Sequence, residues 1–158
     1  MKALITGITG QDDVYLAELL LAKGYKVYGT YRRTSFINFW RLEELGVAQH
    51  PNLHMVDFDR TNIGSCIRLL LISGPTVIYN IATQSFVDVS FDKTCTTAQI
   101  IGLGVLHILE ATRIVNPKPR LYQANISGMF GKDHAFSQDE PTSFHLRSPH
   151  GAANLYYR

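Results

Sequence analysis

Short apolar runs that favour β-strands alternate along this chain with stretches whose apolar residues recur at helical spacing. This alternation predicts an α/β protein, because strands joined by crossover helices lie parallel in one sheet covered on both faces. Right-handed crossovers then build an open, doubly wound parallel sheet, and the simplest strand order is 3-2-1-4-5. The expected strands are residues 3–6, 26–32, 53–58, 76–81 and 120–126, and the expected helices are residues 11–23, 39–45, 63–72 and 97–113.

The first expected strand ends at a glycine-containing turn that leads directly into a helix. Such turns let backbone N–H groups approach a diphosphate at the N-terminus of the helix. We therefore expect a dinucleotide site formed by Gly7, Thr9, Gly10, Gln11 and Asp12. A plain strand-to-helix turn is the alternative, because two glycines alone are a weak motif.

Asp13 stands where dinucleotide-binding turns usually carry a third glycine, which permits close packing of the helix on the strand. A carboxylate there adds bulk and brings a negative charge near the expected diphosphate. At a separation of about 5 Å and an effective dielectric constant of about 20, the repulsion is ~3 kcal/mol, which weakens binding about a hundredfold. Aspartate is favourable in the first turn of a helix, so Asp13 is expected to suit the fold while weakening the ligand.

The end of the second strand bears on the choice between NAD and NADP. An NAD site usually places Asp or Glu there to hold the ribose 2′-hydroxyl group, whereas this chain has YRRTS at residues 31–35. A guanidinium group forms forked, charge-assisted hydrogen bonds with phosphate, so Arg32 is expected to hold the 2′-phosphate of NADP. A solvated basic strand end is the alternative.

The ends of the third and fourth strands complete the expected cofactor site. The carboxylate after the third strand is placed to accept from an adenine amino group, and the segment after the fourth is placed to line the ribose. Taken alone, each segment is more often simple turn chemistry. The residues expected here are Asp57, Phe58, Ile81, Ala82, Gln84 and Ser85.

Composition excludes several other classes of function. Fifteen Lys and Arg against thirteen Asp and Glu leave a net charge of +2, too small to indicate nucleic acid or an anionic membrane. No apolar run is expected to approach a membrane span. Cys66 and Cys95 form no disulfide framework, so a cytoplasmic location is expected, and the histidines show no ligand spacing, so no metal is expected.

Several longer runs resemble a known family. They are MKALITGITGQD (1–12), YRRTS (31–35), NFWRLEELG (38–46), YNIATQSFVDVSF (79–91), LEATRIVNP (109–117), YQA (122–124), MFGK (129–132) and RSP (147–149). Over essentially the whole chain they resemble the extended short-chain dehydrogenase/reductase superfamily and, within it, the GDP-mannose 4,6-dehydratase family. The resemblance implies a Rossmann-like, NAD(P)-binding domain over residues 1–158 and a C-terminal substrate lobe that this chain lacks.

The resemblance also implies a lyase reaction on GDP-mannose. In the family, NADP takes a hydride from C4 of the sugar, water is eliminated across C5 and C6, and the hydride returns at C6. The product is GDP-4-keto-6-deoxymannose. The family's proton transfers use a Thr and a Glu after the fifth strand and a Tyr and a Lys in the pattern Y-x-x-x-K.

The four matching positions of this chain hold other residue types, Ile126, Gly128, His150 and Asn154. The spacing of His150 and Asn154 still places both on one helix face, with Ser148 as the expected cap and Pro149 in the first turn. Asn154 cannot supply the positive charge that lowers a phenol's pKa, and each missing group is commonly worth a factor of about 10²–10⁴ in rate. His150 acting as a replacement base is the open alternative, because its ordinary pKa of about 6.5 suits proton transfer.

Three interpretations therefore remain open. The chain is the NADP-binding domain of a GDP-mannose 4,6-dehydratase, inactive as it stands and thus a pseudoenzyme. Alternatively, it is a non-catalytic nucleotide-binding or oligomerisation module that pairs with itself or with an intact homologue, or an altered chain without function. A GDP-sugar is not expected to bind this chain alone, and the apolar helix at residues 97–113 is either buried on the sheet or pairs with a second subunit.

Overall fold

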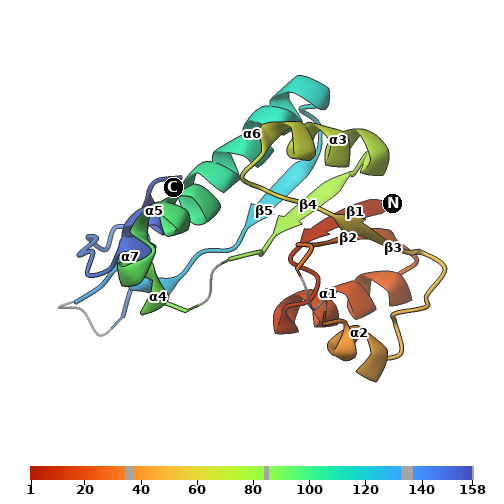
Figure 1. The fold of residues 1–158 in the computed structure, drawn as a ribbon, viewed down its shortest axis with the longest axis horizontal. Coiled ribbons are helices and arrows are strands. Elements are labelled where there is room, and N and C mark those ends of the chain that lie inside the picture. Colours follow the sequence, from red (N-terminus) through yellow and green to blue (C-terminus); the bar gives the residue numbers. More distant parts are fainter. Residues whose placement is uncertain (35–37, 84–85, 133–136, 158) are drawn as a thin grey trace. The chain divides into compact units, whose positions relative to one another are not determined.

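The computed structural model describes residues 1–34, 38–83, 86–132 and 137–157. Contacts divide the chain into two compact units, one formed by Met1–Ala82 with His107–Ala124 and the other by Thr83–Leu106 with Asn125–Arg158. The first unit contains a five-stranded sheet (Figure 1). The second unit consists of short helices and loops.

The sheet is parallel throughout and has the order β3-β2-β1-β4-β5, as the sequence predicts. The four later strands are somewhat shorter than expected, mainly because the last residues of the predicted runs belong to the turns that follow, whereas the first strand begins one residue earlier than expected, at Lys2. In the register, Thr6 at the end of β1 lies beside Thr30 of β2 and Asn80 of β4. The strands are β1 (Lys2–Thr6), β2 (Lys26–Tyr31), β3 (Leu53–Asp57), β4 (Val77–Asn80) and β5 (Arg120–Gln123).

Helices cover both faces of this sheet (Figure 1). α1 (Gln11–Ala22) and α2 (Trp40–Glu44) bury one core with Ala3 and Ile5 of β1. α3 (Ile63–Ser73) and the C-terminal part of α6 (Gly104–Val115) bury the other core, which includes Leu4. Successive residues of β1 thus point into opposite cores, which explains why this strand is apolar throughout.

The long apolar helix expected at residues 97–113 is longer and less regular than predicted. It comprises α5 (Thr94–Thr97), the π-helical segment η1 (Ala98–Leu103) and α6. The whole helix, Thr94–Val115, has 22 residues and an 18-residue window of mean hydropathy 1.4, enough by length and composition to cross a membrane. The expectation that no apolar run approaches a membrane span is wrong in that respect. Buried core helices of soluble proteins reach the same length and hydropathy, so these two properties alone do not identify a membrane segment.

The second unit contains further elements that the strand-and-helix pattern did not predict, α4 (Val89–Asp92) and the 3₁₀ turn η2 (Ser127–Met129). These elements are too short to show a helical period in the sequence. α7 (Pro149–Leu155) was expected, and its N-terminus is built as predicted. The Ser148 hydroxyl accepts from the Gly151 N–H at 3.0 Å, and Pro149 occupies the first turn.

A buried hydrogen-bond network joins the carboxyl ends of β1, β4 and β5. The Thr6 hydroxyl donates to Asn80 Oδ1 at 2.7 Å and accepts from the N–H groups of Ile81 and Ala82, both at 3.1 Å. Asn80 Nδ2 donates to Gln123 Oε1 at 2.5 Å. Thr6 and Asn80 are fully buried, so this network satisfies polar groups that water does not reach.

Replacing Thr6 by valine keeps the shape of the side chain and removes its hydroxyl group. Two backbone N–H groups then lose their acceptor, so we expect the free energy of unfolding to fall by about 1–3 kcal/mol. Urea denaturation followed by circular dichroism measures the loss. Thr6→Ser, which retains the hydroxyl, is the matched control; a valine variant as stable as wild type would contradict this role of Thr6.

Candidate functional site

The turn after β1 requires glycine at its first position. Gly7 has a φ of +83°, a conformation that other residues rarely adopt. A Cβ atom there would also lie 2.9 Å from the Cα of Ala82, which follows β4. The N–H of Gly10 donates to the Gly7 carbonyl at 2.8 Å and closes the turn. The turn therefore lies at the point of the sheet where the strand order reverses, between β1 and β4.

Neighbouring elements hold this turn in place. The Ile8 N–H donates to the Thr30 carbonyl at 2.8 Å, and the Ile8 side chain fills the space above Gly29, where a Cβ atom would meet it at 2.6 Å. From α2, Arg41 Nη1 donates to the Thr9 carbonyl at 3.1 Å. These contacts preorganise the turn on β2 and α2.

The first turn of α1 receives no hydrogen bond from an N-cap side chain. Gly10 is its N-cap residue, whereas Asn62 caps α3 and Ser148 caps α7. Gln11 and Asp12 are exposed at the start of α1. The N-terminus of a helix carries roughly half a positive charge and N–H groups that need acceptors. This end of α1 therefore favours an anion.

Asp13 opposes that preference from inside the same turn. Its side chain is 6% exposed, and its carboxyl group packs against Gly10, where a Cβ atom would collide with Oδ2. Burial raises the pKa of Asp13 to about 7, its own backbone N–H partly offsets this effect, and the charge of Asp12 adds to it. The expectation that Asp13 suits the helix N-terminus is thus only partly met, because burial penalises the carboxylate more than the hydrogen bond from its own backbone N–H stabilises it.

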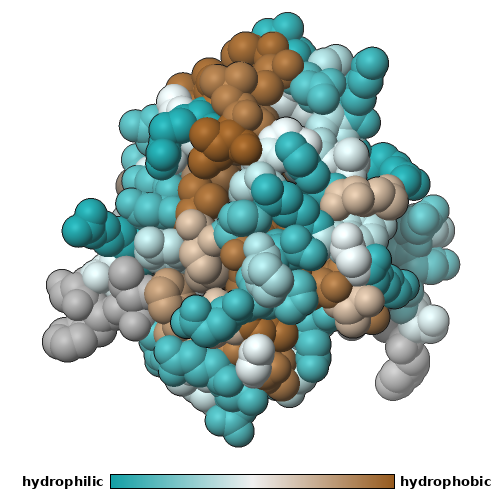
Figure 2. All heavy atoms as spheres, turned by 90° about the vertical axis from the view of Figure 1, so that its right-hand side faces the viewer, coloured by the Kyte–Doolittle hydropathy of each residue, from teal (hydrophilic) through white to brown (hydrophobic). Residues whose placement is uncertain are grey.

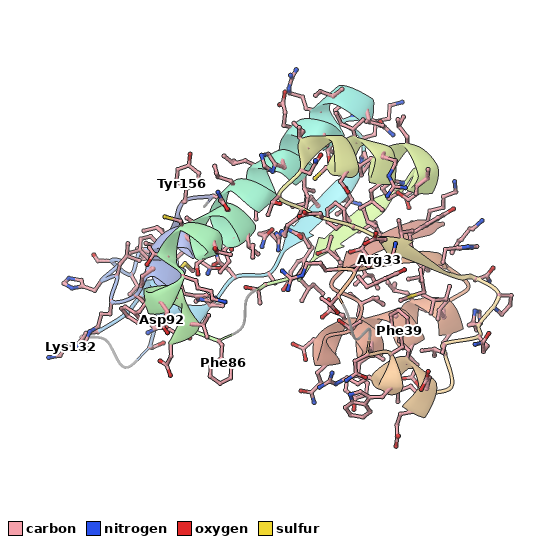
Figure 3. All side chains as sticks on the ribbon, in the orientation of Figure 1. Arg33, Phe39, Phe86, Asp92, Lys132 and Tyr156 are labelled. Atoms are coloured by element: carbon pink, nitrogen blue, oxygen red, sulfur yellow. The ribbon has the colours of Figure 1, made fainter. Side chains whose placement is uncertain are left out.

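Charged residues gather at the carboxyl ends of β2 and β3, as the sequence predicts. Arg32 and Arg33 are exposed after β2, and Figure 3 shows Arg33 near this edge of the sheet. The Arg33 N–H donates to Asp57 Oδ1 at 3.3 Å. Hydrogen bonds from Thr61 lower the pKa of Asp59, and the charge of Arg32 adds a smaller effect in the same direction.

Other predicted residues contribute through the backbone or lie outside the described part of the chain. Phe58 is 6% exposed and its ring belongs to the core beside α3, so only its backbone adjoins this edge. The N–H groups of Ile81 and Ala82 are committed to Thr6. Gln84 and Ser85 are outside the described residues.

Arg60 is a buried residue that the sequence reasoning missed. It is 7% exposed and its guanidinium group donates to the Ala82 carbonyl and to Asn80 Oδ1. The signal in the sequence was a charged residue two positions before the capping residue Asn62, but its burial depends on the distant end of β4. Arg60 therefore fixes the backbone that packs against Gly7.

The second unit holds the four positions at which the resemblance implies proton-transfer residues. Ile126 and Gly128 lie at or beside η2, and Gly151 of α7 packs on Gly128, where a Cβ would meet its carbonyl oxygen at 2.8 Å. His150 and Asn154 lie one turn apart on α7, as expected, and each is 2% exposed.

The side chain of Asn154 is engaged within this unit. Its Nδ2 donates to the His150 carbonyl at 2.8 Å and lies 3.4 Å from His150 Nδ1. Its Oδ1 accepts from the Tyr157 hydroxyl at 2.6 Å. The amide of Asn154 is therefore held by His150 and Tyr157.

Metal-ligating and thiol groups are not assembled into a site in the described residues. No group of three His, Cys, Asp or Glu residues there is arranged to hold a metal ion. Cys66 is buried, and burial raises the pKa of its thiol to about 11, while Cys95 is exposed.

Solved structures of sugar-nucleotide enzymes share this fold. A dTDP-glucose 4,6-dehydratase from Streptomyces venezuelae matches with a TM-score of 0.86 and 23% identity, over 99% of this chain and 49% of its own. A UDP-glucose 4-epimerase from Stenotrophomonas maltophila matches with a TM-score of 0.87 and 16% identity, over 99% of this chain and 46% of its own. These likenesses confirm the Rossmann-like α/β fold class.

Sequence comparison is more specific. GDP-mannose 4,6-dehydratase from Yersinia enterocolitica is 43% identical over 160 residues, which cover 98% of this chain and 43% of the relative. The human GDP-mannose 4,6 dehydratase is 42% identical over 163 residues, with the same coverage. This chain thus spans less than half the length of these relatives. The profile of the GDP-mannose 4,6 dehydratase family matches residues 4–158, and the chain therefore belongs to the GDP-mannose 4,6-dehydratase family.

Proposed function

We propose that residues 1–158 form an NADP-binding domain of the dehydratase type that does not itself dehydrate GDP-mannose. The proposal that this domain binds NADP rests on the turn from β1 into α1. Gly7 adopts a positive φ there, and the N-cap residue of α1 offers no side chain to the first-turn N–H groups. A diphosphate would satisfy these donors. The turn that contains Gly7 and Gly10 has room for the diphosphate of NADP, while the buried carboxyl group of Asp13 weakens the binding of that diphosphate.

The preference for NADP over NAD rests on the charge at the end of β2. Arg32 is exposed there, and its charge acts on Asp59 across the ends of β2 and β3. A guanidinium group is suited to a 2′-phosphate, whereas the NAD-selective carboxylate is absent from residues 31–34, YRRT. Asp57, at the end of β3, is the exposed acceptor proposed for the adenine amino group.

The absence of dehydration rests on the residue types in the second unit. Bound NADP would supply hydride transfer, but this chain's own residues must move the protons of an elimination. Ile126 and Gly128 carry no acid or base. His150 is 2% exposed, and Asn154 replaces the lysine that the family uses beside its tyrosine. We therefore propose a non-catalytic module, in which these residues serve packing.

We further propose that the chain acts in the cytoplasm as a homo-oligomer or as a partner of an intact homologue. Several apolar side chains of the helix Thr94–Val115 are exposed, among them Leu103, Leu109 and Ile114. In the second unit Phe86 is 71% exposed, and Figure 3 shows its ring directed away from the ribbon. Figure 2 shows apolar side chains gathered in a band on the face that it presents. Exposed apolar area of this kind is typical of interaction surfaces.

The cofactor proposal is tested with Arg32→Ala. Because charge-assisted hydrogen bonds contribute about 1.5–3 kcal/mol, we expect the Kd for NADP to rise about tenfold to a hundredfold, with little change for NAD. Isothermal titration calorimetry with both nucleotides measures this. Arg120→Ala, an exposed arginine at the opposite edge of the sheet, is the control. Equal losses for NADP and NAD contradict the assignment of Arg32.

The proposed lack of dehydration is tested by incubating the chain with NADP and GDP-mannose. We expect no 4-keto sugar above the uncatalysed background, because groups commonly worth a factor of about 10²–10⁴ each are missing. Mass spectrometry of the nucleotide sugar detects the loss of water, and an active relative of the family serves as the positive control. Dehydrated product formed by this chain, and abolished by His150→Ala, would establish His150 as a replacement base.

The proposed self-association is tested by light scattering over a range of concentrations. We expect a mass of at least twice the 17.8 kDa of the chain, because its exposed apolar side chains favour burial. Leu109→Glu is expected to lower the associated fraction, whereas Glu110→Gln on the same helix is the control. A mass of 17.8 kDa at every concentration excludes the homo-oligomer.

A further inference from the structure

The carboxyl group of Asp13 fills space in the glycine turn, and its two oxygen atoms also lie in different surroundings. Its Oδ1 is buried and accepts no hydrogen bond from the described residues. Its Oδ2 lies against Gly10, the glycine whose missing side chain lets the backbone approach a diphosphate. The carboxyl group, one of whose oxygens is orphaned, thus adjoins the expected position of the ligand's negative charge through Oδ2.

The surroundings of Asp13 do not neutralise it. Asp12, on the same helix, is the charged side chain that acts on it, and it disfavours the carboxylate. The elements packed against α1 are β1, β2 and α2. Lys2 and Lys26 lie at the amino ends of their strands, away from the turn, and Arg41 is bonded to the Thr9 carbonyl. The remaining titratable groups on these elements are Tyr28 and Tyr31 of β2 and Glu43 and Glu44 of α2.

We infer that the nucleotide binds this chain together with one proton, which Asp13 takes from solvent and holds as a neutral carboxylic acid beside the diphosphate. The inference rests on the proposed function. A new O–H bond forms on Asp13, and no bond of the nucleotide changes. Binding in the neutral form removes the repulsion between two anions in a buried site.

The expected pH dependence follows from the direction of the pKa changes. Burial raises the pKa of Asp13 in the free protein to about 7, and an adjacent anionic ligand raises it further. Affinity is therefore highest below about pH 7, where Asp13 is already protonated, and falls about tenfold per pH unit above it. With an anion about 5 Å away at an effective dielectric constant of about 20, the total loss is about a hundredfold.

Calorimetric titration of NADP at several pH values, in buffers of low and high ionisation enthalpy, measures both affinity and proton uptake. We expect wild type to take up close to one proton per nucleotide at about pH 8 and to bind more tightly at about pH 6. Asp13→Asn has a side chain of nearly equal shape that is always neutral. This variant should lose both the proton uptake and the pH dependence of affinity that come from Asp13. The 2′-phosphate of NADP titrates near pH 6 in both proteins and cancels in the comparison.

Two further variants complete the test. Glu18→Gln removes an exposed carboxylate from the same helix and should retain the wild-type pH profile, and Asp13→Gly gives a second neutral turn in case the asparagine variant does not fold. The unfolding free energy gives a readout without ligand. The folded-state pKa of Asp13 lies above its unfolded value of 3.8, so wild type should lose stability relative to Asp13→Asn as pH rises from about 4 to about 7.

The outcomes separate this inference from the cofactor proposal. Parallel pH profiles for wild type and Asp13→Asn, with both proteins binding NADP, overturn the proton linkage alone. Failure of wild type, Asp13→Asn and Asp13→Gly to bind at any pH overturns the cofactor proposal and the linkage together. Proton uptake by wild type that is lost in both neutral variants supports both.

Discussion

The hydrogen bonds of the Thr6 hydroxyl group hold the point of the sheet on which the rest of the candidate site depends. Thr6 ends β1 and bonds to Asn80 and to the backbone just after β4, where the strand order reverses. Ala82 thereby comes so close to Gly7 that no side chain fits between them. Arg60 holds the Ala82 carbonyl from the other side. The glycine turn is thus shaped by strand ends that are far apart in the sequence, as well as by its own residues.

Within this turn, two opposite effects act on the carboxyl group of Asp13. A helix N-terminus stabilises a carboxylate, but burial against Gly10 removes water from it and leaves Oδ1 without a partner among the described residues. Burial has the larger effect, so the pKa rises instead of falling. A charge placed in this way acts on stability and on anion binding through the same equilibrium, which is why protonation links the two properties.

The helix α7 keeps the one-turn spacing of the Y-x-x-x-K pattern with other residue types at both positions. His150 and Asn154 retain the one-turn spacing, and the Ser148 cap and the Gly151–Gly128 contact still define where the helix packs. The amide of Asn154 bonds to the His150 carbonyl and the Tyr157 hydroxyl, so it has a structural role here. An amide in this position carries no charge with which to shift a neighbouring pKa.

The sequence by itself determined the parallel sheet, its strand order and the glycine turn, because apolar periodicity and glycine spacing are local properties of the chain. The family followed from the resemblance of longer runs such as residues 38–46 and 79–91. It also placed Arg32 and Asp57 at one edge of the sheet, since parallel strands end together. Only the tertiary structure decided that Phe58 belongs to the core, that Arg60 is buried against the end of β4, and that Asp13 loses its water. Burial and partner choice depend on contacts between residues distant in the chain, and those contacts set the electrostatic free energy of a charged group more strongly than its sequence neighbours do.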